Sequence, residues 1–225
     1  MEATNSILSA LPPEEWRALR EQAEWVTFPA GRVLYHAGDP ITNVYFPDTG
    51  LTAAFAVLPS GDQVAVVTIG AEGMLGMPAL LGVDSSPNQI RVQVASAGHQ
   101  IPASVARQTF ERSQVFRRLV LREIGRVYVQ VARSAVCNRF HSHRQRVGRW
   151  LLVITGKTDR ASVAITHELL AQMLGGPRHA ISSVIAEFRA KGLVQQVRGG
   201  IEVLDAAALA EVACECHRTD LNLWS

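Results

Sequence analysis

The sequence predicts an α+β fold in which an N-terminal β-roll of the jelly-roll type is followed by one long helix and then by a winged helix. Three observations predict this order. Turn-forming residues recur between short apolar segments from Thr27 to about Ala103. Glycine is then rare and proline absent from Thr109 to about Asn138, and a helix-turn-helix pattern begins at Thr166. We therefore expect three regions, at residues 1–108, 109–140 and 141–225.

The first region contains several short apolar or alternating segments separated by glycine and proline turns. They are Val33–Tyr35, Val44–Phe46, Leu51–Leu58 and Val64–Ile69. Many short strands at this spacing indicate an all-β sandwich or barrel, and a helix from Pro13 to about Glu24 is expected before it. A metal-dependent enzyme on such a barrel needs clustered histidines and a carboxylate. Residues 25–105 contain only His36 and His99, well separated, so we expect no enzyme.

The second region predicts a helix that pairs with another copy of itself. Four apolar residues recur at the 4-3-4 spacing of a two-stranded coiled coil, namely Val120, Ile124, Val127 and Val131. We expect them to form the interface of a homodimer. The alternative is a helix that packs on the β-roll of its own chain. The segment Phe140–His143 predicts a break before another helix at residues 144–154.

The segment that starts at Thr166 has the spacing of a helix-turn-helix. Leu170 lies on the inner face of the first helix, and Gly175 permits a tight turn. Ile181 and Val184 then anchor the second helix from below. The alternative is an ordinary helical hairpin packed in a core.

A hairpin follows, with strands at Leu193–Val197 and Ile201–Leu204 and a turn at Arg198, so the whole predicts a winged helix. Asp205 is expected to cap a last helix. A reader of the major groove contacts bases from the exposed start of its second helix. Six residues are the candidate DNA contacts: Thr166, Arg178, His179, Ser182, Ser183 and Arg198.

Charge is distributed unevenly along the 225 residues, although the net charge is only +2. Residues 1–110 carry 5 Arg/Lys and 10 Asp/Glu, while residues 111–225 carry 17 and 10. A basic half that contains a helix-turn-helix indicates contact with the phosphates of double-stranded DNA; a solvated basic face is the alternative. The chain shows no secretory leader and no apolar run of the roughly 20 residues that span a bilayer. We therefore expect no membrane contact and a cytoplasmic protein.

The cysteines Cys137, Cys214 and Cys216 are too few and too poorly spaced for a disulfide framework. The pair Cys214 and Cys216 suggests a metal site, but residues two apart on a helix point to different sides. His141 and His143 near Cys137 suggest a metal or pH-sensitive site, with ordinary surface histidines as the alternative. Buried thiols and no bound metal are the expectation.

Three sequence segments carry a resemblance to a known family. They are Phe28–Asp39 with Val44–Phe46, then Gly70-Ala-Glu-Gly73 with Leu75-Gly76, and then Glu168–Gly175. With the order of the predicted elements, the chain resembles the Crp/Fnr family of bacterial transcription regulators from about Leu11 to Leu209. The resemblance implies a homodimer on a pseudo-palindromic operator, RNA polymerase as a partner, and a small-molecule effector. It also implies that Arg178 contacts guanine, while His179 and Ser183 replace residues that are charged in many members.

The expected effector pocket departs from the family pattern. Cyclic-nucleotide receptors of the family hold the ribose with a glutamate after a Phe-Gly pair, and the phosphate with an arginine on the next strand. This chain has Leu75-Gly76-Met77 and, where the arginine belongs, Asn88. Arg91 lies on the opposite face of that strand. The expected pocket residues are Met74, Leu75, Gly76, Met77, Asn88, Gln89 and Val131.

We therefore expect an effector other than cyclic AMP. Two alternatives stay open: a regulator that uses no effector, and a β-roll module that acts on a protein partner. The N-terminal region also lacks the cysteines that iron-sulfur sensors of the family use. Haem ligation by His36 or His99 is the remaining cofactor hypothesis, with a structural histidine as its alternative, so no cofactor is predicted.

Overall fold

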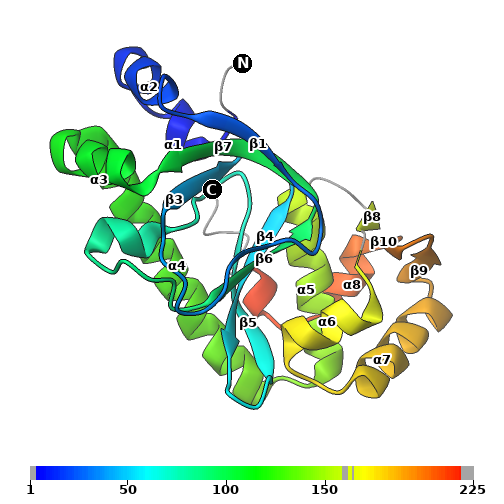
Figure 1. Cartoon of the computed structure of the whole chain (residues 1–225). Helices are drawn as coiled ribbons and strands as arrows, with labels where there is room; N and C mark the ends of the chain where they lie inside the picture. Colours follow the sequence, from blue (N-terminus) through cyan, green and yellow to red (C-terminus); the bar gives the residue numbers. More distant parts are fainter. Residues whose placement is uncertain (1–3, 159–161, 164, 219–225) are drawn as a thin grey trace. The chain divides into compact units, whose positions relative to one another are not determined.

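The computed structural model describes residues 4–158, 162–163 and 165–218, and the chain divides into two compact units (Figure 1). The first unit is formed by Met1–Ala54 and Thr68–Val129, and the second by Phe55–Val67 and Gln130–Ser225. Among the described residues, no helix is long and apolar enough to cross a membrane.

The first unit is a β-roll with short helices at its ends. Its strands form a three-stranded sheet in the order β1-β7-β3 and a four-stranded sheet in the order β2-β6-β4-β5; residues 55–57 of β4 and 63–67 of β5 belong to the second unit. The strands are β1 (Glu24–Phe28), β2 (Val33–Tyr35), β3 (Asn43–Pro47), β4 (Leu51–Val57), β5 (Gln63–Ile69), β6 (Gln89–Val94) and β7 (Ser96–Pro102). The helices are α1 (Ser6–Ser9), α2 (Pro13–Arg20), the 3-10 helix η1 (Met77–Leu81) and α3 (Ala103–Arg112). The four strand segments predicted from sequence are confirmed.

Strand pairing explains why the first predicted helix is shorter than expected. Residues Glu24–Phe28 pair with β7 in antiparallel register, with Trp25 opposite His99, so the chain is extended from Glu24 onward. The helix α2 therefore ends at Arg20 rather than near Glu24. Aromatic packing fills the core beside this sheet, where the rings of Phe46 and Phe116 lie 6.3 Å apart.

The long helix α4 spans Gln114–Phe140. The sequence predicts one helix from Thr109, whereas the structure interrupts it at Ser113, whose backbone is extended. The Ser113 hydroxyl accepts a hydrogen bond from Phe116 N at 3.0 Å, as a helix cap does. At its other end α4 stops at Phe140 and α5 begins at His143, so the predicted break is confirmed.

The second unit contains a winged helix in which the sheet order is β8-β10-β9. Its elements are α5 (His143–Thr158), β8 (Ser162–Val163), α6 (His167–Leu174), α7 (Arg178–Ala190), β9 (Val194–Val197), β10 (Gly200–Val203) and α8 (Ala206–Val212). Gly175 ends α6 with a φ of 59°, in the left-handed region that favours glycine. Asp205 caps α8 by accepting a hydrogen bond from Ala208 N, as predicted.

The inner face of α7 differs by one residue from the prediction. Ile181, Ile185 and Phe188 are the buried residues of this helix, whereas Val184 is half-buried. The spacing of four and then three residues places the buried side chains in one row along the helix. Ile185, rather than Val184, is therefore the second anchor.

Candidate functional site

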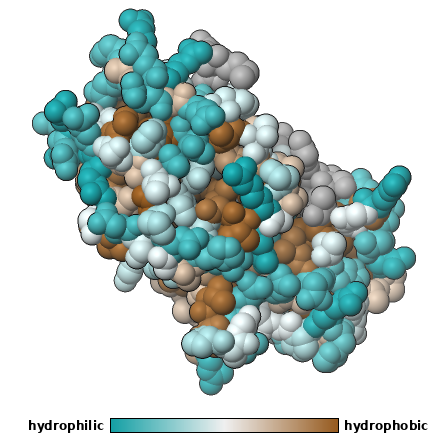
Figure 2. Space-filling view, viewed as in Figure 1, coloured by the Kyte–Doolittle hydropathy of each residue, from teal (hydrophilic) through white to brown (hydrophobic). Residues whose placement is uncertain are grey.

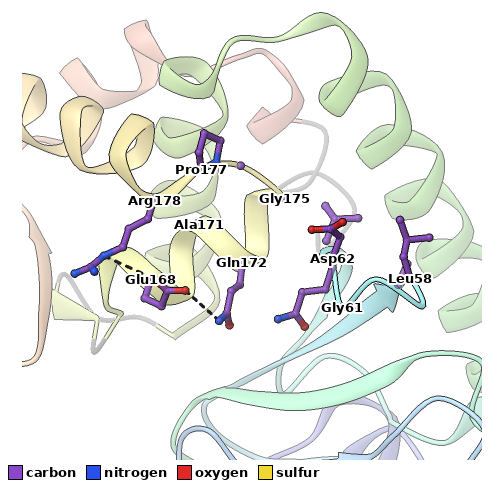
Figure 3. Close-up of a pocket in the computed structure, with 13 residues that line it drawn as sticks. Leu58, Gly61, Asp62, Glu168, Ala171, Gln172, Gly175, Pro177 and Arg178 are labelled. Atoms are coloured by element: carbon purple, nitrogen blue, oxygen red, sulfur yellow. Dashed lines mark hydrogen bonds and ion pairs between the residues drawn. The ribbon is translucent and has the colours of Figure 1, made fainter.

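Arg178 is the first residue of α7 and its side chain is 70% exposed. Its guanidinium Nε lies 3.7 Å from Oε2 of Glu168 on α6, and both groups face solvent (Figure 3). An exposed ion pair of this kind stabilises a fold by only about 0–1 kcal/mol. The geometry therefore lets Arg178 exchange this carboxylate for another hydrogen-bond acceptor at small cost.

Two further predicted contacts are exposed on α7, and a third is turned into the fold. His179 and Ser183 are exposed. Ser182 is half-buried, and its hydroxyl lies 3.0 Å from Nδ1 of His167. The other ring nitrogen of His167 lies 3.3 Å from Oε1 of Gln196 on β9. Ser182 therefore belongs to a chain of hydrogen bonds that connects α7 to α6 and α6 to the wing, which is the hairpin of β9 and β10.

The remaining predicted contacts lie at the start of α6 and at the tip of the wing. The Thr166 hydroxyl caps α6 by accepting a hydrogen bond from Leu169 N at 3.1 Å, and the residue is exposed. Arg198 is exposed in the turn between β9 and β10, where Gly199 has a φ of 79°. The surface over α7 and the wing is mainly hydrophilic on the face that Figure 2 shows. Polar surfaces are typical of proteins that contact DNA.

A pocket of about 680 Å³ in the second unit is lined by the turn between β4 and β5 and by α6 with the start of α7 (Figure 3). Its charged lining residues are Asp62, Glu168 and Arg178. The pocket therefore shares Arg178 with the exposed start of α7.

The predicted effector residues of the first unit are largely part of its core. Met74, Leu75 and Met77 are 0%, 1% and 8% exposed. Gly76 has a φ of 84°, and a Cβ atom there would lie 2.9 Å from the Asn43 carbonyl oxygen. The three side chains are apolar and the fourth residue has none, so they offer a ligand no side-chain hydrogen bond.

The other predicted pocket residues lie farther along the chain. Asn88 precedes β6, Gln89 begins it, and both are half-buried. Val131 belongs to the second unit and is 42% exposed. On β6, burial lowers the pKa of Arg91, and the fully buried Gln93 donates a hydrogen bond to the Arg91 carbonyl oxygen at 3.1 Å. The polar face of this strand is therefore partly covered by the protein.

The predicted dimer seam is divided between two faces of α4. Val120 is fully buried within the chain, Ile124 and Val127 are half-buried, and Val131 is exposed. For Val120 the burial argues against contact with a partner and supports the alternative of packing within its own chain. The exposed apolar side chains include Leu121 and Tyr128, at 50% and 75% exposure.

The two histidines considered for haem lie in different surroundings. His36 is exposed in a turn where its backbone N donates to Asp39 Oδ2 at 2.7 Å. His99 is buried beside Trp16 and Trp25, whose rings stand nearly perpendicular to its own, at 90° and 80°, with ring centroids 5.1 and 5.0 Å away. Burial lowers the pKa of His99, although the Asp48 carboxylate, 3.7 Å away, acts in the opposite direction. Its contacts are those of a structural histidine.

The structure brings together four potential metal ligands that the sequence analysis treated separately. The ligand atoms of Cys137, His141, Cys214 and Cys216 all lie within 4.8 Å of one another. Cys214 and Cys216 do not point to different sides of one helix as expected, because α8 ends at Val212 and Cys214 lies outside any helix. The available signal was the Cys-x₃-His spacing at the end of the long helix combined with Cys-x-Cys near the end of the chain.

The fold and the exposed start of α7 define a winged-helix DNA-binding protein that carries a β-roll of the cyclic-nucleotide-binding type. The family model of the cyclic nucleotide-binding domain matches residues 25–113, and that of the Crp-like helix-turn-helix domain matches residues 145–212. Together they cover more than half of the chain. The chain belongs to the Crp/Fnr family of transcription regulators, which is not a family of enzymes.

Relatives of this family match over most of their length. The CRP-like cAMP-activated global transcriptional regulator of Mycobacterium tuberculosis is 22% identical over 222 residues, covering 94% of this chain and 97% of the relative. The structure of FixK2 from Bradyrhizobium japonicum has a TM-score of 0.73 at 13% identity, covering 85% and 98%. The c-di-GMP responsive regulator CLP of Xanthomonas campestris has a TM-score of 0.71 at 14% identity, covering 86% and 100%. At these identities the structural matches establish the fold alone.

Proposed function

We propose that the protein is a homodimeric transcription regulator that reads a pseudo-palindromic operator in double-stranded DNA. The observation that carries this proposal is the exposure of Arg178, His179 and Ser183 at the start of α7, directly after the glycine turn of a helix-turn-helix. The excess of basic residues in the C-terminal half supports it. In this proposal residues 1–108 form the sensor domain, 109–140 the dimerisation helix and hinge, and 141–225 the DNA-binding domain.

The positions of the candidate contacts support different roles for them: contact with base edges, contact with phosphates, and positioning of α7. Arg178 donates two hydrogen bonds to O6 and N7 of a guanine, which its planar guanidinium fits. His179 and Ser183 contact neighbouring base edges, and Thr166 and Arg198 contact phosphates. Ser182 acts differently, because its bond to His167 positions α7 against α6. RNA polymerase is the expected partner of the DNA-bound dimer.

The test is selection of bound sequences from random duplex DNA by the purified protein and by Arg178→Ala. The expected operator has two half-sites about 10–10.5 base pairs apart, or a multiple of that spacing. Loss of the guanine contact is expected to cost about 1–3 kcal/mol and to remove the preference for guanine at that position. Arg189→Ala is the matched control, since Arg189 is exposed in the last turn of the same helix. Equal effects of both substitutions, or no selected motif, would contradict the proposal.

We infer that the effector is not cyclic AMP. Met77, which is buried, stands where a cyclic-nucleotide receptor of the family has the glutamate that binds the ribose, and Asn88 stands where it has the arginine that binds the phosphate. Ligand groups left unpaired in a buried site cost about 1–3 kcal/mol each. One relative is named for activation by cAMP and a structural neighbour for its response to c-di-GMP, so family membership alone does not assign an effector.

A thermal-shift screen separates an unknown effector from the absence of any. A ligand present at one hundred times its dissociation constant stabilises a protein by about 2.7 kcal/mol. We expect no shift with cyclic AMP and a clear shift with the true effector. The buried apolar residues at the expected pocket also favour a second candidate, a regulator without effector, for which no compound produces a shift and operator binding needs no addition. Saturable stabilisation by cyclic AMP at micromolar concentration would overturn the inference.

A further inference from the structure

We propose that Cys137, His141, Cys214 and Cys216 bind one zinc-class divalent metal ion in a closed tetrahedral site. All four residues belong to the second unit, and their ligand atoms lie within 4.8 Å of one another. Three thiolates and one imidazole form a donor set that zinc uses in structural sites. No part of the DNA-reading proposal is needed for this site.

The distances fit a single ion. Zinc binds cysteine sulfur at about 2.3 Å, so a regular tetrahedron of such ligands has edges of roughly 3.8 Å. The sulfur atoms of Cys137 and Cys214 are 3.6 Å apart, and Cys216 Sγ lies 3.7 Å from His141 Nδ1. The distance between these two sulfur atoms is also far greater than the length of a disulfide bond, about 2.05 Å. Soft thiolate ligands select zinc over the harder magnesium and calcium ions.

The local backbone structure places the side chains of Cys137 and His141 on the same face of the helical path. Cys137 lies in the last turn of α4 and His141 follows directly after its end. The His141 backbone N still donates to the Cys137 carbonyl oxygen, at 3.1 Å, so the helical path continues to His141. Residues four apart on such a path project from the same face.

The segment that carries the other two ligands, Cys214 and Cys216, packs against α5. Cys214 N donates a hydrogen bond to the Gln145 carbonyl oxygen at 3.3 Å. A Cβ atom at Gly148 would lie 3.2 Å from Ala213 Cα, so a glycine allows the segment before Cys214 to approach the helix closely. The three cysteines are each only 1% exposed. A bound ion is therefore shielded from water by the surrounding fold.

The neighbours of the histidine provide a second observation in favour of a metal. His141 presents Nδ1 to the cysteines, while its Nε2 lies 3.4 Å from Oε1 of the exposed Glu215. Metal-binding histidines almost always use the nitrogen that faces away from the ion in a hydrogen bond to a carboxylate or similar group. His217 is oriented differently, with Nδ1 2.8 Å from the Cys214 carbonyl oxygen, and it lies outside the ligand set.

Buried cations balance the charge of the site. Three thiolates and a divalent ion carry one net negative charge, and the buried side chains of Arg146 and Arg149 are the nearby positive groups. Hydrogen bonding with Cys214 lowers the pKa of Cys137, whereas the hydrogen bond with Cys137 and burial raise the pKa of Cys214, and burial raises that of Cys216, so a bound cation is what stabilises all three thiolates together. The thiolate is the form in which cysteine binds metals.

Metal content of the full-length protein tests the site directly. Protein produced with added zinc and purified anaerobically under reducing conditions is expected to hold one zinc ion per chain by mass spectrometry. Replacement by cobalt is expected to give the thiolate-to-metal charge-transfer band and the intense visible bands of tetrahedral cobalt. Neither measurement involves DNA, so the outcome is independent of the operator experiments.

Four variants define the ligands. His141→Gln and Cys216→Ser are expected to reduce zinc content and to change the cobalt spectrum, whereas His143→Gln, at the start of α5 and outside the cluster, keeps both. Glu215→Gln retains the ion with about 10–100-fold lower affinity in competition with a chelator. Circular dichroism verifies that each variant is folded. A folded wild-type protein without bound metal, or equal losses in the His141 and His143 variants, would overturn the proposal.

Discussion

Gly76 lies in the loop that follows β5 and has a backbone conformation that only glycine adopts easily. Its φ is 84°, and the preceding residue, Leu75, exchanges two backbone hydrogen bonds with Tyr45, of 3.1 and 2.8 Å. A Cβ atom at position 76 would meet the Asn43 carbonyl oxygen at 2.9 Å. The glycine therefore supports the packing of this loop on β3.

Two glycines of the same loop region form a matched test of this reading. Gly82 has a φ of 82°, but no atom lies within 4 Å of a Cβ added there. Alanine at either position costs roughly 1–2 kcal/mol for the left-handed conformation. Gly76→Ala also creates a contact with backbone, so we expect it to lower the free energy of unfolding by about 1–3 kcal/mol more than Gly82→Ala. Urea unfolding measures both; equal losses would show that the loop relaxes.

His99 makes the stability of the β-roll depend on pH. It is buried between Trp16 and Trp25, and burial lowers the pKa of His99 despite the nearby Asp48 carboxylate. In an unfolded chain the pKa of histidine is about 6.5. Because the folded state binds the proton more weakly, protonation favours unfolding. The free energy of unfolding is therefore highest above about pH 6.5 and decreases as the pH falls below that value.

The measurement is urea unfolding between about pH 7.5 and about pH 5.5, below which carboxylates also titrate. His99→Gln is expected to flatten the decrease, whereas His36→Gln, which changes an exposed histidine, retains the wild-type slope. Tryptophan fluorescence reports the transition close to His99, because Trp16 and Trp25 contact its ring. An unchanged slope in the His99 variant would assign the pH dependence to other groups.

The helix α4 carries two apolar rows that the sequence alone does not distinguish. The inner row, with Phe116 and Val120, is fully buried within the chain. The outer row includes Leu121 and Tyr128, which are exposed. Residues 121, 125, 128, 132 and 135 follow the 4-3-4-3 spacing of a coiled-coil seam. We propose that this outer row, flanked by Ile124 and Val131, is the dimer interface.

Tyr128→Glu tests the outer row. An unpaired carboxylate in an apolar interface costs several kcal/mol, so we expect dimer association to weaken at least about tenfold. Light scattering over a concentration series gives the association constant. Arg122→Glu is the control, since it places the same residue on an exposed position of α4 outside the row. A dimer equally stable in both variants would show that another surface holds the two chains together.

The elements that the sequence predicts well are those fixed by local chemistry. Glycine turns, capping residues and alternating apolar residues predict the strands of the β-roll, the break after Phe140 and the order of the elements in the winged helix. Errors arose where packing between distant segments decides the outcome. The burial of Val120 depends on which side of α4 the rest of the chain covers, and the end of α2 depends on the pairing of β1 with β7.

The candidate sites also differ in whether their residues are close together in the sequence. Arg178, His179 and Ser183 are exposed within one local motif, so their spacing predicted their exposure. The sulfur atoms of Cys137 and Cys214 lie close together although the two residues are 77 positions apart in the sequence. A local sequence pattern cannot predict such a contact. The Ser182 link to His167 was missed for a similar reason, because it needs the packing of α7 against α6.

The uneven distribution of charge along the chain determines which part of the protein is attracted to DNA. Residues 111–225 carry 17 Arg/Lys and 10 Asp/Glu, whereas residues 1–110 carry 5 and 10. Attraction to phosphates is therefore confined to the half that holds the winged helix, and the acidic half opposes non-specific coating of DNA. A dimer doubles the number of basic contacts on one duplex.

This charge distribution predicts a steep dependence of operator binding on salt. A protein that makes about 6–10 phosphate contacts loses on the order of 10³–10⁵ in affinity between about 50 and 200 mM salt, because bound counterions are released. We expect the dimer to fall in this range in fluorescence anisotropy titrations of its selected operator. Arg198→Ala removes one phosphate contact per chain and is expected to reduce the slope of log affinity against log salt by about 2 per dimer. Glu211→Gln changes an exposed charge on α8 that is not among the proposed DNA contacts, and it leaves the slope unchanged. A slope near zero would mean that base edges and not phosphates dominate binding, contrary to the proposed role of the basic half.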